Sequence, residues 1–215
     1  TPGLLISPEK IKDNIEAMIQ ISGTANRLWP HIKTYKMNPI IELQKDYGIN
    51  RFKCATLSEV ELLCKAEVGH ILLAIQPTEK KLDVLLDLQK KYPKIQFSTL
   101  LDNDKSLKLF NRIAIQKKQT LAVWIDLNIG MNRTGIIPDE KAFKLYKDLE
   151  KLTPLKFMGL HAYDGHIRSK SEIKRKKDSD NAFLSVLYLK EKIENHNKKS
   201  IDIIAGGSLT FLPHS

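Results

Sequence analysis

The sequence has few cysteines, few aromatic residues and no long apolar run. Its two cysteines, Cys54 and Cys64, form neither a CxxC pair nor a metal-binding spacing, which favours free thiols in a reducing compartment. No apolar stretch approaches the ~20 residues that a membrane span needs. We therefore expect a soluble, cytoplasmic protein with no membrane partner and no disulfide framework.

The formal net charge of +10 raises the possibility of a nucleic-acid partner. Most lysines, however, are spread along segments with helical patterns, where they resemble solvated helix faces. The one local basic cluster, residues 168–177, lacks the interleaved aromatic side chains of a single-strand binding surface and is expected to be a loop. We expect no nucleic-acid partner.

Apolar segments of strand length alternate with segments of helical period. Strands are expected at residues 28–33, 52–55, 71–75, 95–100, 121–127, 157–161 and 201–204. The helices between them carry end signals, such as Gly23 after the first, the capping box of Thr56 and Glu59, and a last helix over residues 179–195. Alternation in units of about 30 residues predicts a parallel sheet, either doubly wound or closed as a (β/α)8 barrel.

The barrel is favoured over the doubly wound sheet by two observations. No GxGxxG motif follows the first strand, and polar groups follow the carboxyl ends of four different strands. A barrel needs eight strands, and the seventh ends shortly before residue 215. We therefore expect residues 1–215 to form an incomplete barrel domain that lacks its last strand, and an N-terminus trimmed or left out before Thr1.

The polar groups at these strand ends each allow a functional and a structural interpretation. Lys33 could be a desolvated amine nucleophile or a surface cation, and His31 would point to the same side of the strand. Arg133 could be a charged donor or a surface ion-pair partner, and Tyr163 and His166 could be acid–base groups or ordinary loop residues.

A Gly-Gly-Ser sequence follows the seventh strand and offers backbone N–H groups and a hydroxyl. Gly206, Gly207 and Ser208 could hold a phosphate or form a plain turn. A lysine, an arginine, a tyrosine–histidine pair and a phosphate cradle on one barrel face together indicate a pyridoxal phosphate site.

Six motifs in this order give the chain a resemblance to a known family. They are TPGLL (residues 1–5), PHIKTYK (30–36), CATLSE (54–59), Asp126 with GMNRTG (130–135), GLHAYDGH (159–166) and AGGS (205–208). With these motifs the chain resembles the D-threonine aldolase and D-serine dehydratase family, which shares the alanine racemase type of barrel.

The resemblance implies a role for each site residue. Lys33 would bind pyridoxal 5'-phosphate covalently, with Lys36 as the less favoured lysine. Arg133 would face the phenolic oxygen of the cofactor, Tyr163 would lie beside its ring, and Gly206, Gly207 and Ser208 would hold its phosphate. His166 or His161 would transfer protons on the substrate side.

The resemblance also implies a reaction and several partners. A D-threonine aldolase would cleave a D-3-hydroxy amino acid to glycine and an aldehyde. The alternatives are a D-serine dehydratase, a racemase-like enzyme and a non-catalytic cofactor-binding protein. The family's C-terminal β-domain, its divalent metal and a possible homodimer would involve residues outside this chain. Trp29 and Tyr35 stand where the family commonly has an arginine and a histidine.

Overall fold

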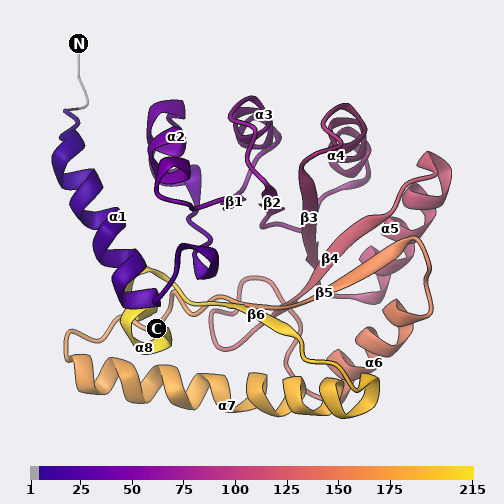
Figure 1. The fold of residues 1–215 in the computed structure, drawn as a ribbon. Coiled ribbons are helices and arrows are strands. Elements are labelled where there is room, and N and C mark those ends of the chain that lie inside the picture. Colours follow the sequence, from indigo (N-terminus) through magenta and orange to yellow (C-terminus); the bar gives the residue numbers. More distant parts are fainter. Residues whose placement is uncertain (1–4) are drawn as a thin grey trace.

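The computed structural model describes residues 5–215, so most of the TPGLL motif lies outside the described residues. These residues form six strands: β1 (Arg51–Cys54), β2 (His70–Leu73), β3 (Gln96–Leu101), β4 (Leu121–Leu127), β5 (Leu155–Ala162) and β6 (Asp202–Ala205). Every neighbouring pair is parallel, and the order in space is the order in sequence. The result is a curved sheet that forms a half-barrel (Figure 1).

Consecutive strands are connected by helices on the outer side of the curved sheet (Figure 1): α3 (Leu57–Lys65), α4 (Glu79–Lys91), α5 (Asp104–Lys117), α6 (Glu140–Glu150) and α7 (Glu172–Asn197). Helices α1 (Pro8–Ser22) and α2 (Asn38–Asp46) precede β1, and α8 (Phe211–His214) follows β6. Short 3-10 helices are η1 (Ala25–Arg27), η2 (Ile32–Thr34) and η3 (Ser208–Thr210). Among the described residues, no helix combines the length and apolar character needed to cross a membrane.

The expected strand at residues 28–33 is wrong. His31 makes one isolated parallel bridge with Lys53, and the chain then turns into η2 instead of continuing as a strand. The turn is stabilised because Nδ1 of His31 accepts the backbone N–H of Lys33 at 3.2 Å. The apolar residues Leu28 and Ile32 are buried as expected, but by packing of a loop rather than by sheet pairing.

Two other sequence features behave differently from expectation. The basic segment is largely helical, because α7 begins at Glu172, where Ser171 caps the helix by accepting the N–H of Lys174. At the start of α3 the Thr56 hydroxyl accepts the N–H of Glu59, as predicted. The Glu59 carboxylate, however, accepts the N–H of Ala55 and not that of Thr56.

The sheet separates two apolar regions. The larger core lies between the strands and the surrounding helices, and it includes outward-facing residues of β4 such as Val123 and Ile125. The smaller cluster contains Leu72, Leu100 and Trp124 on the inner side. Along β4, Asp126 follows Trp124 on this inner side because alternate residues of a strand share a face. The curved sheet therefore holds an apolar base with polar groups at the carboxyl ends of its strands.

Candidate active site

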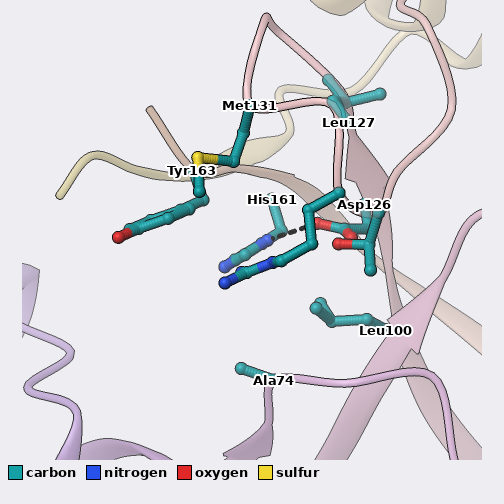
Figure 2. Close-up of a pocket in the computed structure, with 9 residues that line it drawn as sticks. Ala74, Leu100, Asp126, Leu127, Met131, His161 and Tyr163 are labelled. Carbon is teal, nitrogen blue, oxygen red and sulfur yellow. Dashed lines mark hydrogen bonds and ion pairs between the residues drawn. The ribbon is translucent and has the colours of Figure 1, made fainter. Parts of the chain in front are cut away.

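A pocket lies at the carboxyl ends of the central strands (Figure 2). The residues that line it come from the ends of β3 to β5 and from the loops after β2, β4 and β5: Ala74, Leu100, Asp126, Leu127, Met131, Arg133, Thr134, His161 and Tyr163. Parallel strands open their carboxyl ends at one edge, so residues distant in sequence meet here. Arg133 and Tyr163 are two of the residues that the sequence indicates as cofactor ligands.

Asp126 and His161 form a buried hydrogen-bonded pair on the pocket wall (Figure 2). They are register partners on β4 and β5, and Nδ1 of His161 lies 2.7 Å from Oδ1 of Asp126. Nε2 of Gln76 donates to the other carboxylate oxygen at 3.0 Å. Burial opposes ionisation of Asp126, but the hydrogen bonds from His161 and Gln76 hold its pKa below the usual value. The charged carboxylate therefore orients His161 through its Nδ1–H group.

Lys53 reaches His161 across the inside of the sheet. Its ammonium lies 3.1 Å from Nε2 of His161, although β1 and β5 are not neighbouring strands. Burial lowers the pKa of Lys53 to about 8, with the Asp126 charge acting in the opposite direction. Lysine is seldom this buried unless it is paired, and here the partner is the Asp126–His161 pair.

Lys53 does not stand out among the sequence motifs. The available signal is its place between Phe52 and Cys54 in a short strand. Both neighbours point into the outer core, and strand alternation therefore directs Lys53 to the inner side. A lysine at an inward position of a buried strand is itself an indication of a functional or paired charge.

Lys33 lies on η2, close to the charged groups just described, and not at the mouth of a strand. Its charge and that of Lys53 both act on His31, whose pKa falls to about 4, mainly through burial. His31 is therefore neutral and can accept the backbone N–H of Lys33. The two lysines, His31 and the Asp126–His161 pair share one region of the half-barrel.

Lys36 is a weaker candidate for covalent binding than Lys33. Its ammonium forms an ion pair at 3.2 Å with Glu59, whose carboxylate is buried at the start of α3. This pairing holds Lys36 toward the helix and reduces its availability as a free amine. Covalent binding by Lys33 stays a prediction.

Trp29 and Tyr35, the two departures from the family pattern, do not line this pocket. The Tyr35 hydroxyl donates to Oε1 of Gln44 on α2 at 2.6 Å. Trp29 packs edge-on against Trp124, with ring centroids 5.9 Å apart, beneath the polar layer. Tyr35 therefore anchors the loop that carries Lys33, and Trp29 fills the base of the half-barrel.

Arg133 and Tyr163 lie together at the mouth of the pocket. The Arg133 guanidinium carbon is 5.4 Å from the centroid of the Tyr163 ring. The loop that carries Arg133 is shaped by Asn128, whose side-chain oxygen accepts the N–H groups of Gly130 and Asn132. None of the ion pairs within residues 5–215 involves Arg133, so its guanidinium can serve an anionic oxygen.

The Gly-Gly-Ser turn lies next to Tyr163, but the N–H groups of its two glycines are engaged, contrary to expectation. Gly206 donates to the carbonyl of Ala162 at 3.0 Å, and Gly207 donates to the Thr210 hydroxyl at 2.9 Å. Ser208 begins η3 and is exposed, so its backbone N–H and its hydroxyl are the predicted donors of this turn that remain. The use of all three residues for a phosphate stays a prediction.

The side chain of Asp164 stabilises this turn through hydrogen bonds. Its fully buried carboxylate accepts hydrogen bonds from the Thr210 hydroxyl at 2.6 Å and from Nε2 of His214 at 2.7 Å. Burial opposes ionisation, yet these hydrogen bonds lower the pKa of Asp164. The carboxylate therefore links β5 to the segment after β6.

His161 and His166 occupy different environments. His161 lines the pocket, whereas His166 is exposed and its ring lies against Gly130. A Cβ atom at Gly130 would come within 2.6 Å of Nε2 of His166, so this contact requires glycine. Of the two histidines that the sequence indicates for proton transfer, His161 has the better position.

No group of three or more histidine, cysteine or acidic residues within residues 5–215 is arranged to hold a metal ion. The charged side chains of the pocket are engaged with one another or lie singly, as Arg133 does. The site as described is thus suited to bind an anionic organic ligand through arginine and lysine side chains.

The chain is similar to two curated proteins of known activity. It is 26% identical over 179 residues to D-threonine aldolase of Arthrobacter sp, covering 80% of this chain and 46% of that protein. It is 25% identical over 141 residues to D-threo-3-hydroxyaspartate dehydratase of Delftia sp. (strain HT23), covering 65% and 37%. The chain spans less than half the length of either relative.

The fold is shared with a solved structure of D-threonine aldolase from Filomicrobium marinum. The TM-score is 0.89 at 23% identity, and the match covers 100% of this chain and 59% of the other. Residues 6–208 match the family described as alanine racemase, N-terminal domain. This match spans nearly the whole chain and agrees with the half-barrel and the order of its motifs. The chain therefore belongs to the alanine racemase N-terminal domain family.

Proposed function

We propose that this chain is the cofactor-binding part of a pyridoxal 5'-phosphate-dependent lyase acting on D-3-hydroxy amino acids, with D-threonine aldolase as the specific activity. The observation that carries the proposal is the grouping of Arg133, Tyr163 and His161 in one pocket at the carboxyl edge of the sheet, with Lys33 on the nearby η2, where its charge and that of His161 both act on His31. The similarity to proteins named D-threonine aldolase and D-threo-3-hydroxyaspartate dehydratase supports the lyase class.

The residues present fit this cofactor. Arg133 offers a guanidinium without an ion-pair partner within residues 5–215, and Tyr163 offers an aromatic face beside the Gly-Gly-Ser turn. Arg133 would hold the phenolic oxygen, Tyr163 would contact the ring, and Ser208 would donate to the phosphate together with the turn of Gly206 and Gly207. The Lys33 amine would bind the cofactor aldehyde.

The side chains of the chain supply the acid–base part of the reaction. His161, which lines the pocket and is oriented by Asp126, would accept the proton of the substrate's 3-hydroxyl group at Nε2, the nitrogen that Lys53 contacts. Loss of this proton allows the Cα–Cβ bond to break and an aldehyde to leave, and glycine forms when Cα regains a proton. When bound, the cofactor would supply the electron sink for the charge left at Cα.

Dehydration is the alternative reaction, and the similarity to a D-threo-3-hydroxyaspartate dehydratase favours it as the second candidate. In that reaction the Cα proton is removed and the 3-hydroxyl group leaves. The same lysine, arginine and histidine would serve both reactions, so the products distinguish them.

We extend the proposal to the whole protein. An incomplete barrel domain over residues 1–215 would be completed by a further strand and a C-terminal β-domain. That part would carry the divalent metal that assists the 3-hydroxyl group, and the whole protein would form a homodimer. The substrate would be a small D-amino acid and the location cytoplasmic.

The test is to trap the cofactor on its lysine. Pyridoxal 5'-phosphate is titrated into the protein, the visible absorbance is followed, and borohydride reduction with peptide mass mapping identifies the labelled lysine. We expect the label on Lys33, its loss in Lys33→Ala, and its retention in the matched Lys36→Ala control. A label on another lysine, or an unchanged band in Lys33→Ala, would refute the assignment.

The reaction itself is assigned from products. Acetaldehyde and glycine from D-threonine would support the aldolase, whereas oxaloacetate from D-threo-3-hydroxyaspartate or pyruvate from D-serine would support a dehydratase. Labelled Lys33 with none of these products would support a non-catalytic cofactor-binding protein and would contradict the lyase.

A further inference from the structure

We propose that Lys53 and His161 hold a single shared proton, balanced by Asp126, and that Lys53 is a positioning residue that keeps His161 neutral at the pocket wall. The proposal rests on the function given above and deepens it, because it assigns the resting protonation state of His161 and the condition, a neutral Lys53, under which His161 accepts a proton from the substrate. The proton count itself concerns only side chains of this chain.

The hydrogen-bond directions follow from the chemistry of the three groups. An ionised carboxylate only accepts, so Asp126 must receive the Nδ1–H of His161 across their 2.7 Å contact. Nε2 of a neutral imidazole with Nδ1 protonated is an acceptor, and the Lys53 ammonium 3.1 Å away is the donor. Each nitrogen of His161 therefore has a defined partner.

A second proton on the Lys53–His161 pair, here called the unit, would be costly in free energy. Protonated His161 beside charged Lys53 would put two cations within 3.1 Å of each other in a buried site, with one carboxylate against them. His161 can become charged only when Lys53 is neutral. Nζ of Lys53 and Nε2 of His161 therefore share one proton. The pair accepts another proton only after Lys53 has released its own.

The charges around the unit favour one proton and not two. Asp126 on β4 and Asp164 after β5 attract a proton to Lys53, while Lys33 repels it. Arg133 from the loop after β4 lowers the pKa of His161, as do Lys53 and, above all, burial. His31 lies beside both lysines and is neutral. Two carboxylates thus face three cations, which leaves no excess negative charge to stabilise protonated His161.

The residue that accepts the proton and the residue that sets its protonation state therefore lie on different sides of the pocket wall. His161 lines the pocket, and Lys53 touches it from the interior. Lys53 first releases its proton to solvent, which leaves the unit without its shared proton. The unit then takes the proton of the substrate's 3-hydroxyl, holds it opposite Asp126 and returns it to Cα, so one proton enters and one leaves in each turnover.

The test uses 15N NMR of the histidine rings of the 215-residue chain without cofactor. In the wild type we expect a neutral His161 with Nδ1 protonated, unchanged across about pH 5 to 8, the window in which an ordinary histidine titrates. Lys53→Met removes the cation in contact with Nε2 and leaves the Asp126 hydrogen bond in place, so the pKa of His161 should rise and the ring should become protonated within that window. Lys53→Arg retains a permanent cation and should restore the neutral ring.

Lys36→Met is the matched control, because it removes a lysine whose ion pair with Glu59 lies outside the unit. A His161 titration that is the same in wild type and folded Lys53→Met would overturn the proposal. If that variant does not fold, the wild-type tautomer decides: an Nε2–H form or an imidazolium at neutral pH overturns it. Because no cofactor is present, failure of the Lys33 trapping experiment would leave this result intact.

Discussion

The guanidinium of Arg133 lies over the ring of Tyr163, 5.4 Å from its centroid. The contact joins the loop after β4 to the end of β5 and places a cation and an aromatic face on one side of the pocket. Neither residue lies on a regular element, so their positions depend on the loops. The turn at Asn128 and the short connection to buried Asp164 hold these loops in place.

Removing the Arg133 guanidinium should weaken cofactor binding. A hydrogen bond to a charged group contributes about 1.5–3 kcal/mol, so Arg133→Ala should raise the dissociation constant by about ten-fold or more. Absorbance titration with pyridoxal 5'-phosphate measures the change. Arg112→Ala, which removes an exposed ion pair with Glu79, is the control and should bind as the wild type does. Equal affinity in both variants would argue against a role for Arg133.

The two histidines should differ in their effect on turnover. His161→Gln removes a proton acceptor from the pocket wall and should lower the rate of D-threonine cleavage by about 10²–10⁴-fold. His166→Gln alters an exposed ring that lies against Gly130 and should have a much smaller effect. Initial rates at saturating substrate make the comparison. A larger loss in the His166 variant would reverse the assignment of the proton-transfer group.

The stability of the turn after β6 should depend on the charge of Asp164. Because hydrogen bonds depress its pKa in the folded protein, its stabilising effect is present above the unfolded value of about 3.9 and is lost as pH falls through the folded value. Urea unfolding at several pH values should show Asp164→Asn less stable than the wild type by about 1–3 kcal/mol at neutral pH. The difference should shrink in acid.

Asp180→Asn serves as the control for that measurement. Asp180 is exposed on α7 and pairs with Lys176 one turn away, a type of contact that contributes little. Its replacement should leave the unfolding free energy nearly unchanged at every pH. A wild-type-like acid profile for Asp164→Asn would show that the buried carboxylate is not charged in the folded chain.

Gly159 should not tolerate a side chain. Its φ is 142°, and a Cβ atom there would lie 2.2 Å from the carbonyl oxygen of Asp202 on the neighbouring strand. Strain and overpacking each cost about 1–3 kcal/mol, so Gly159→Ala should destabilise the fold strongly or prevent folding. Gly23→Ala has a φ of 80° and no atom within 4 Å of the new Cβ, so it should show only the conformational cost. Thermal unfolding of both variants tests the difference.

The regular part of the fold follows from local signals in the sequence. The apolar run of β4 and the helix that Thr56 caps are recognisable because strand burial and helix capping depend on neighbouring residues. The segment with Leu28 and Ile32 has the same apolar character but lacks a strand partner over most of its length. Which buried segment pairs and which only packs depends on the complete sheet, so local pattern could not separate the two.

Motifs in the sequence select residues that line the pocket, but the protonation and hydrogen-bonding state of a residue depends on contacts that no motif contains. Arg133 and Tyr163 line the pocket, and their binding of a cofactor stays a prediction. The N–H of Gly207 is engaged by Thr210, three residues further along, and no local glycine pattern reveals that. Lys53 becomes significant only when β1 and β5 face each other across the curved sheet, a relation set by the number and order of strands.

The contact between Lys53 and His161 also has a consequence for folding kinetics. Its two residues are 108 positions apart, whereas each neighbouring strand pair joins segments much closer in sequence. Long loops close late because their entropy cost comes before any stabilising contact. The contacts among Lys53, His161 and Asp126 should therefore form after the transition state of folding. Substitutions at Lys53 should accelerate unfolding while leaving the refolding rate nearly unchanged.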